Sequence, residues 1–268
     1  MKSHFNDWQK SLQMPIISYP TSPVSLNDLN HLLTEVVSRA AEDSLRLNNG
    51  EICLTLSGGL DSSFCLAKLR EVVGYKTRIN TFTIAWSEDY PDIQYARKMA
   101  EIFGTFHAEL IPTQSEIAEA QTELFSLERR EAESLGNVAV FMAYQKLAEL
   151  GQHCVIAHDG IDELLGGYWE HRRYKNQSRK VQAFTDLWAR LEPEHIKPLF
   201  WKAQKFSINL ILPYLNPDLA SFLTRIPLDE RTSFTVSKIP LRTLAEKYLP
   251  KEILERKKLG FCSALGEN

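Results

Sequence analysis

The stretch Ser57-Gly58-Gly59-Leu60-Asp61-Ser62-Ser63 decides the fold of this chain. It directly follows a short apolar run, residues 52–56, and opens a helical pattern at about residues 62–73. Paired glycines between a buried strand and a helix predict a turn in which backbone N–H groups and the positive end of the helix dipole face one point. The three serines add hydroxyl donors there. The turn is therefore predicted to hold an anion such as pyrophosphate.

Asp61 lies inside this predicted anion site, where its carboxylate would repel a bare phosphate. Its presence predicts a bridging Mg²⁺ ion, which a carboxylate and phosphate oxygens can share. The stretch has neither the G-K-[ST] ending of a Walker A loop nor the spacing of a G-x-G-x-x-G turn. The alternative interpretation is an ordinary strand-to-helix turn with an N-cap residue.

Outward from this turn, apolar runs alternate with helical patterns. Runs at 79–86, 106–111 and 154–157 predict three more strands, and helical spacing appears from residue 29, at 92–103 and at 138–150. Thr113-Gln114-Ser115-Glu116 is typical of a capping box that opens another helix. This alternation predicts an α/β fold with a parallel sheet covered on both faces. Ligands collect at the carboxyl ends of such strands.

The same pattern divides the chain into three parts. Residues 1–24 form a lead-in with three prolines, and residues 25–175 carry the alternation of strands and helices. Residues 176–268 are predicted to be mainly helical, with helices at 181–191, 195–206, 217–223 and 241–248. The chain shows no internal repeat and no low-complexity segment.

A second motif follows the predicted strand at 154–157. It reads Asp159-Gly160-Ile161-Asp162-Glu163-Leu164-Leu165-Gly166-Gly167-Tyr168 and places three carboxylates within five residues. Two carboxylates that converge from neighbouring loops can hold Mg²⁺ between phosphate oxygens. Acidic residues favoured by the dipole of a helix N-terminus are the alternative explanation for Asp162 and Glu163.

Composition excludes several classes of protein. The chain has 268 residues, a hydrophobic fraction of 44% and a charged fraction of 24%, which suits a globular protein with a real core. A formal net charge of −3 does not indicate the basic surface that a general nucleic-acid-binding protein needs. No apolar stretch is long enough to span a membrane. The four cysteines show no zinc spacing. Cys53, Cys65 and Cys154 lie in apolar runs and are expected to be buried free thiols, which is typical of the cytoplasm.

The first motif resembles the PP-loop of the N-type ATP pyrophosphatases, and the second resembles the G-[DE]-G-[AS]-D-E-[LI]-F-G-G-Y signature of the asparagine synthetase family. That family is related to the β-lactam synthetases. The resemblance implies a fold of the adenine-nucleotide alpha hydrolase type and the splitting of ATP to AMP and pyrophosphate. By resemblance, Asp61 and Asp162 would bind Mg²⁺, Asp159 would lie near an acyl-adenylate, and Gly160 would belong to the nucleotide site.

Further segments extend the resemblance over residues 26–262. The T-F-[ST]-I pattern at 81–84 implies that Thr83 and Ile84 line an adenine site, although these residues also suit an ordinary strand core. Lys238 occupies the lysine position of K-x-x-L-R, and in the family this lysine stabilises charge on the reacting phosphate. A solvated lysine at a helix start is the alternative. Residues 256–261 resemble R-x-K-x-G-F, which includes Lys257 and Lys258.

The sequence departs from the family at two places. His158 replaces a glycine of the second motif, and it is either a wall of a reshaped acceptor pocket or a hydrogen-bonded filler. The family's E-x-R-x-P-[FY]-L-D becomes a segment in which Asn209, Ile211 and Asn216 replace the three charged residues. These losses place aspartate as the substrate in doubt.

The resemblance implies an ATP-dependent ligase that adenylates a carboxylate and passes it to ammonia or an amine. No glutaminase domain is expected, so nitrogen would come from free ammonia, an amine of the substrate, or a separate glutaminase or biosynthetic partner. Two other hypotheses stay open. One is a PP-loop enzyme with another acceptor, such as a tRNA base oxygen, and the other is a non-catalytic relative that binds ATP.

Overall fold

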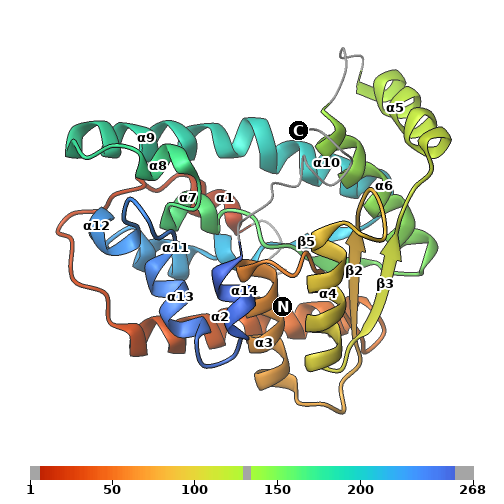
Figure 1. The fold of residues 1–268 in the computed structure, drawn as a ribbon, viewed down its shortest axis with the longest axis horizontal. Helices are drawn as coiled ribbons and strands as arrows, with labels where there is room; N and C mark the ends of the chain where they lie inside the picture. Colours follow the sequence, from red (N-terminus) through yellow and green to blue (C-terminus); the bar gives the residue numbers. More distant parts are fainter. Residues whose placement is uncertain (1–6, 129–133, 257–268) are drawn as a thin grey trace.

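The computed structural model describes residues 7–128 and 134–256, and its fold is drawn in Figure 1. Five parallel strands form one sheet in the order β3-β2-β1-β4-β5. The strands are β1 (Ile52–Thr55), β2 (Ile79–Ile84), β3 (Phe106–Leu110), β4 (Cys154–Ile156) and β5 (Asn209–Ile211). The predicted α/β parallel-sheet architecture is therefore confirmed.

The central strands of the sheet are apolar on both faces. Ile52, Cys53 and Leu54 are consecutive in β1, so their side chains alternate between the faces, yet each is at most 1% exposed. Both faces must therefore be covered, as a parallel sheet requires. The thiols of Cys53, Cys65 and Cys154 are free and buried, as predicted, while Cys262 lies outside the described residues.

Helices from the first half of the chain cover the sheet. Helix α2 packs against α3, β1 and β4, while α4 packs against β2 and β3, and α6 packs against β2. The helices of this half are α2 (Leu26–Leu47), α3 (Leu60–Val73), α4 (Pro91–Ile102), α5 (Gln114–Glu128) and α6 (Leu135–Glu149), of which α5 packs against α6. The capping box before α5 is confirmed, since Thr113 and Glu116 exchange side-chain and backbone hydrogen bonds. No helix among the described residues is both long enough and apolar enough to cross a membrane.

The fifth strand was not predicted. Asn209, Leu210 and Ile211 pair with Cys154, Val155 and Ile156 of β4, so a segment beyond residue 175 completes the sheet. Residues 176–268 were predicted to be mainly helical, and they also contribute this one short strand. Three residues are too few to show the period of a strand, and their pairing partners lie more than 50 residues away in the chain.

The remainder of the second half is helical within the described residues. Figure 1 shows α9 and α10 along the top of the view, with α2 at the bottom and strands between them. The elements are α7 (Ile161–Leu165), α8 (Trp169–Arg172), α9 (Gln177–Leu191), a π-helical turn (Glu192–Ile196), α10 (Lys197–Lys205), a 3₁₀ turn (Pro213–Leu215), α11 (Pro217–Leu223), α12 (Leu228–Arg231), α13 (Ile239–Ala245) and α14 (Lys251–Glu255).

A buried arginine joins the lead-in to this helical part. The lead-in contains α1 (Trp8–Leu12). Arg231, which is 0% exposed, donates hydrogen bonds to the carbonyls of Ile16, Leu164, Thr224 and Ile226 at 2.7–3.3 Å. One guanidinium therefore fixes the lead-in and the end of α7 in the same place. This contact positions the second motif.

Replacing Arg231 with methionine is expected to lower the free energy of unfolding by about 2–4 kcal/mol, because it leaves buried carbonyls without a donor. Urea unfolding followed by circular dichroism measures the change. Arg225→Met is the matched control, because Arg225 is exposed in the same segment and its loss should cost little. Equal midpoints for the two variants would contradict this role for Arg231.

Candidate active site

The PP-loop, residues 57–63, joins β1 to α3 at the carboxyl edge of the sheet. Gly58 has φ +65°, and a Cβ atom there would lie 2.5 Å from the backbone of Tyr95, so only glycine fits. Ser57 and Ser62 join their hydroxyls at 3.2 Å, and Ser57 Oγ also accepts from the N–H of Gly59. The loop is therefore held by its own side chains, while the N-terminus of α3 opens toward the edge of the sheet.

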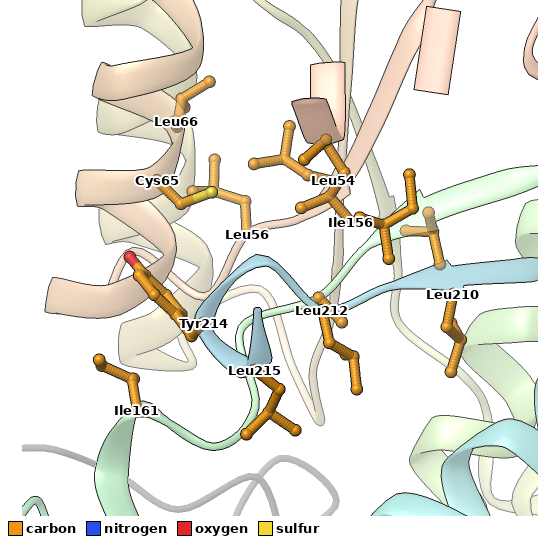
Figure 2. Close-up of a cluster of buried hydrophobic side chains, with 14 of the residues drawn as sticks. Leu54, Leu56, Cys65, Leu66, Ile156, Ile161, Leu210, Leu212, Tyr214 and Leu215 are labelled. Atoms are coloured by element: carbon orange, nitrogen blue, oxygen red, sulfur yellow. The ribbon is translucent and has the colours of Figure 1, made fainter. Parts of the chain in front are cut away.

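Tyr214 contacts the first turn of α3. Its hydroxyl donates to the carbonyl of Asp61 at 2.9 Å, and Figure 2 shows the ring reaching toward this helix. Tyr214 belongs to the 3₁₀ turn after β5, and its ring is 1% exposed. The segment that lost the family's charged residues therefore still supports the PP-loop through its aromatic residue. Tyr214 occupies the aromatic position of the P-[FY]-L pattern, which is the sequence feature that could have indicated this contact.

The acidic loop, residues 159–163, lies at the end of β4, directly beside β1 in the sheet. Asp162 and Glu163 are 8% and 7% exposed. A Cβ atom at Gly167 would lie 1.6 Å from Asp162 Oδ1 and 2.7 Å from Lys238 Cε, so the missing side chain leaves room for both. The glycine therefore permits the close approach of this carboxylate and this lysine.

Lys238 joins the two motifs. It precedes α13 in a left-handed conformation, with φ 53°, and its side chain is buried. Its Nζ atom lies 2.5 Å from Asp61 Oδ2 and 2.7 Å from Asp162 Oδ1. Burial alone would lower the pKa of this ammonium, but Asp162 and Asp61 outweigh burial and raise the pKa above its ordinary value. Lys238 is therefore a fixed cation between two carboxylates.

The same two carboxylates fit a divalent cation. Asp61 Oδ1 is buried and accepts no hydrogen bond from the described residues, so this oxygen is available to a metal ion. Among residues 7–128 and 134–256 no cluster of three or more His, Cys, Asp or Glu side chains could hold a metal alone. Two carboxylates, with phosphate oxygens and water completing the shell, suit Mg²⁺. Because Lys238 Nζ contacts both carboxylates, a metal between them would require the ammonium to move.

A small basic cavity of about 80 Å³ adjoins the PP-loop. Three basic residues, Lys238, Arg242 and Arg256, line it together with two acidic ones, Asp61 and Asp92. Arg256 donates to the carbonyl of Ser57 at 3.1 Å and pairs with Asp92. Sequence reasoning quoted both arginines within family-like segments but gave them no role. Their position makes the cavity suitable for an anion.

Three further residues that the resemblance assigned to the nucleotide site, Thr83, Ile84 and Gly160, are buried. Thr83 and Ile84 are buried in the core, and the Thr83 hydroxyl bonds to the carbonyl of Leu56, so a nucleotide could meet only their backbone groups. Gly160 has φ +92°, and a Cβ atom there would lie 2.3 Å from Leu215. The glycine is therefore required by packing. Lys257 and Lys258 lie outside the described residues.

Asp159 and His158 follow β4 but differ in their partners. His158 bonds through Nε2 to the carbonyl of Thr55 at 2.7 Å, and burial lowers its pKa, so the ring is neutral and bridges β1 to β4. This hydrogen bond supports the second of the two expectations for His158, a hydrogen-bonded residue at the end of the strand. Asp159 instead contacts His195 at 2.5 Å, a pairing that the sequence did not indicate. Burial raises the pKa of Asp159, but the contact with His195 outweighs burial and lowers it.

Two of the residues that replace the family's charged positions, Asn209 and Asn216, make local structural contacts. Asn209 pairs with Cys154 at the amino end of β4, and its side chain bonds to the carbonyl of His153. Asn216 caps α11 by accepting from the N–H of Asp218. Asn209 therefore lies at the opposite edge of the sheet from Asp61, and Asn216 acts in a helix cap.

These features define a class: an α/β protein in which a glycine-rich loop and an acidic loop meet at the carboxyl edge of a parallel sheet. The family model for asparagine synthase matches residues 32–206 and 202–268, so the chain belongs to the asparagine synthase family. The predicted family is thereby confirmed.

Curated relatives are asparagine synthetases described as glutamine-hydrolyzing. The protein of Gallus gallus is 29% identical over 222 residues, covering 80% of this chain and 39% of the relative. That of Mus musculus is 27% identical over 248 residues, covering 89% and 43%. The chain thus spans about two fifths of their length. An NAD⁺ synthetase structure from Burkholderia pseudomallei aligns with 92% of this chain and 95% of its own, at 15% identity and a TM-score of 0.39.

Proposed function

We propose that this chain is an ATP-dependent, amide-forming ligase. It would adenylate a substrate carboxylate, release pyrophosphate, and pass the acyl group to ammonia or an amine. The observation that carries the proposal is the meeting of Asp61, Asp162 and Lys238 at distances of 2.5 and 2.7 Å, beside a basic cavity. Membership of the asparagine synthase family supports the same reaction class.

In the first step, an oxygen of the carboxylate attacks the α-phosphorus of ATP. The bond from that phosphorus to the bridging oxygen breaks, and pyrophosphate leaves into the PP-loop. N–H groups at the start of α3 and the hydroxyls of Ser57, Ser62 and Ser63 would hold it there. Arg242 and Arg256 line the adjoining cavity and would balance its charge.

Mg²⁺ held by Asp61 and Asp162 would neutralise phosphate oxygens as charge shifts to the leaving group. Lys238, displaced from these carboxylates, would reach the reacting phosphate through its flexible stem. A cation that reaches the phosphate in a buried site stabilises developing charge more strongly than one in water. Gly160 and the backbone of Thr83 and Ile84 would contribute to the nucleotide pocket.

In the second step, the nitrogen lone pair attacks the acyl carbon, the bond from that carbon to the AMP oxygen breaks, and AMP leaves. Asp159 would lie beside the acyl group. Ammonia could be free or come from a separate glutaminase, since the curated relatives are named for glutamine hydrolysis.

A substrate screen tests the proposed function. The purified chain is mixed with Mg·ATP, ammonium chloride or hydroxylamine, and a panel of carboxylates that includes aspartate. AMP and pyrophosphate are both quantified. Equal amounts of both products with one carboxylate are expected. Formation of ADP and phosphate, or no turnover with any carboxylate while ATP still binds, would contradict the proposal.

A further inference from the structure

A π-helical turn separates α9 from α10 and carries His195. Pro193 explains the turn, because proline has no N–H and its ring collides with the carbonyl four residues earlier in an α-helix. The turn instead closes with the N–H of Lys197 bonded to the carbonyl of Glu192, five residues back. Such turns are often found at functional sites. The extra residue changes the direction of the side chains that follow.

His195 contacts the acidic loop from this turn. Its Nε2 atom lies 2.5 Å from Asp159 Oδ1, although the two residues are 36 positions apart. The histidine side chain is 49% exposed, whereas that of Asp159 is 23% exposed. The pair therefore connects a largely enclosed carboxylate to solvent through one imidazole ring.

The contact with His195 lowers the pKa of Asp159 and so favours its ionised form. The other titratable groups whose charge it senses or affects are His158 on the same loop, Tyr144 of α6 and Tyr168 before α8. Burial raises the pKa of both tyrosines, so they stay uncharged, and burial lowers that of His158. Among these neighbours, His195 is the side chain that both contacts the Asp159 carboxylate and is exposed to solvent, so it offers a proton at Asp159 a path to water.

We propose that His195 is a positioning residue that orients Asp159 and carries a proton from it to solvent during attack by the nitrogen nucleophile. This inference rests on the proposed function. It concerns the second step alone, since the PP-loop and Lys238 serve the first. The role follows the logic of base and orienting partner found in many acyl-transfer sites.

The proton balance of the step requires such an acceptor. Ammonium must lose one proton to expose its lone pair, and the nitrogen loses another after the C–N bond forms. AMP leaves with the electron pair of the broken C–O bond. The proton lost by ammonium would pass to Asp159, then to neutral His195, and then to water. The proton lost after the C–N bond forms would go to the phosphate oxygen of the departing AMP with either nucleophile. A nucleophile that is uncharged at neutral pH would avoid the first transfer.

The test compares ammonia with hydroxylamine in His195→Gln. Glutamine keeps an N–H donor near the position of Nε2 but cannot carry a proton. We expect the ammonia-dependent kcat to fall on the order of a hundredfold. Hydroxylamine is far less basic than ammonia, and hydroxamate formation should stay near the wild-type rate. The KM for ATP should not change. His153→Gln, at the amino end of β4 and exposed, is the matched control.

The outcomes separate this inference from the proposed function. A wild-type chain that forms no AMP with any carboxylate overturns the proposed function and the inference together. An active wild type with an unchanged His195→Gln overturns the inference alone. Equal losses with both nucleophiles would also overturn it, because a purely structural contact would affect both reactions.

A second measurement does not depend on turnover. The short contact should give the wild-type protein a downfield imidazole N–H resonance in proton NMR. This resonance should disappear in His195→Gln and in Asp159→Ala, while His153→Gln should retain it. Its presence in Asp159→Ala would show that the pair does not form, and the inference would fall.

Discussion

Asp61→Asn and Asp162→Asn should each abolish Mg²⁺-dependent turnover with little change in fold. Asparagine has the shape of aspartate, and Lys238 keeps one carboxylate partner in each variant. A metal contribution to phosphoryl chemistry is worth several kcal/mol. Since each 1.4 kcal/mol is about a factor of ten in rate, we expect losses on the order of a thousandfold. Pyrophosphate release at increasing Mg²⁺ concentration measures the effect.

A binding experiment completes this test. Calorimetry with ATP in Mg²⁺ and in EDTA should show a metal-dependent gain in affinity for the wild type and a smaller gain for either variant. Asp218→Asn is the matched control, because that side chain is 64% exposed and pairs with Arg39 at the surface. Near-normal pyrophosphate release by one variant would remove that residue from the proposed metal site.

Local patterns were sufficient to predict most of the sheet and the PP-loop. Strands β1–β4 are apolar runs followed by glycine turns or helices, and each was predicted within about two residues, the usual error in such boundaries. Strand β5 was missed because Asn209–Ile211 carries too few residues for a period and depends on pairing with β4. Tertiary contact determined this element.

The residues of the candidate site likewise divide into those that local sequence patterns predict and those that depend on tertiary contact. Asp61 and Asp162 stand in recognisable motifs, and their loops follow adjacent strands, so their proximity could be expected from the topology. The bridging position of Lys238 could not, because it lies 177 residues from Asp61 and takes a left-handed backbone conformation. His195 was missed for a related reason: helical periodicity cannot foresee the π-helical turn that directs it to Asp159.

Lys238→Met is expected to lose AMP formation by on the order of a hundredfold to a thousandfold, as is typical when one preorganised charge is removed. ATP binding should stay within a few-fold, because only stabilisation specific to the transition state raises the rate. Quantified AMP and calorimetric ATP binding measure the two effects. Lys247→Met is the matched control, because Lys247 is exposed and lies just after the same helix.

The position of Lys238 adds an expectation about stability. Removing the ammonium leaves Asp61 and Asp162 close together without their common cation, and breaking a buried ion pair typically costs about 3–5 kcal/mol. Mg²⁺ should replace the missing charge. The melting temperature of Lys238→Met should therefore fall in EDTA and rise more on addition of Mg²⁺ than that of the wild type. If Mg²⁺ does not change the melting temperature of Lys238→Met, then the ammonium and the metal do not share these carboxylates.

The same variant decides between an enzyme and a nucleotide sensor. In a sensor, Lys238 would only neutralise the charge of Asp61 and Asp162. Its removal would alter stability and metal binding, and there would be no AMP formation to slow. In a ligase, the lysine must leave the carboxylates when the metal arrives and then act on the phosphate, so AMP formation falls even when Mg²⁺ restores the fold. Suppose that both proteins bind ATP, that Mg²⁺ stabilises the variant, and that neither forms AMP with any carboxylate tested. The non-catalytic alternative would then replace the proposed ligase.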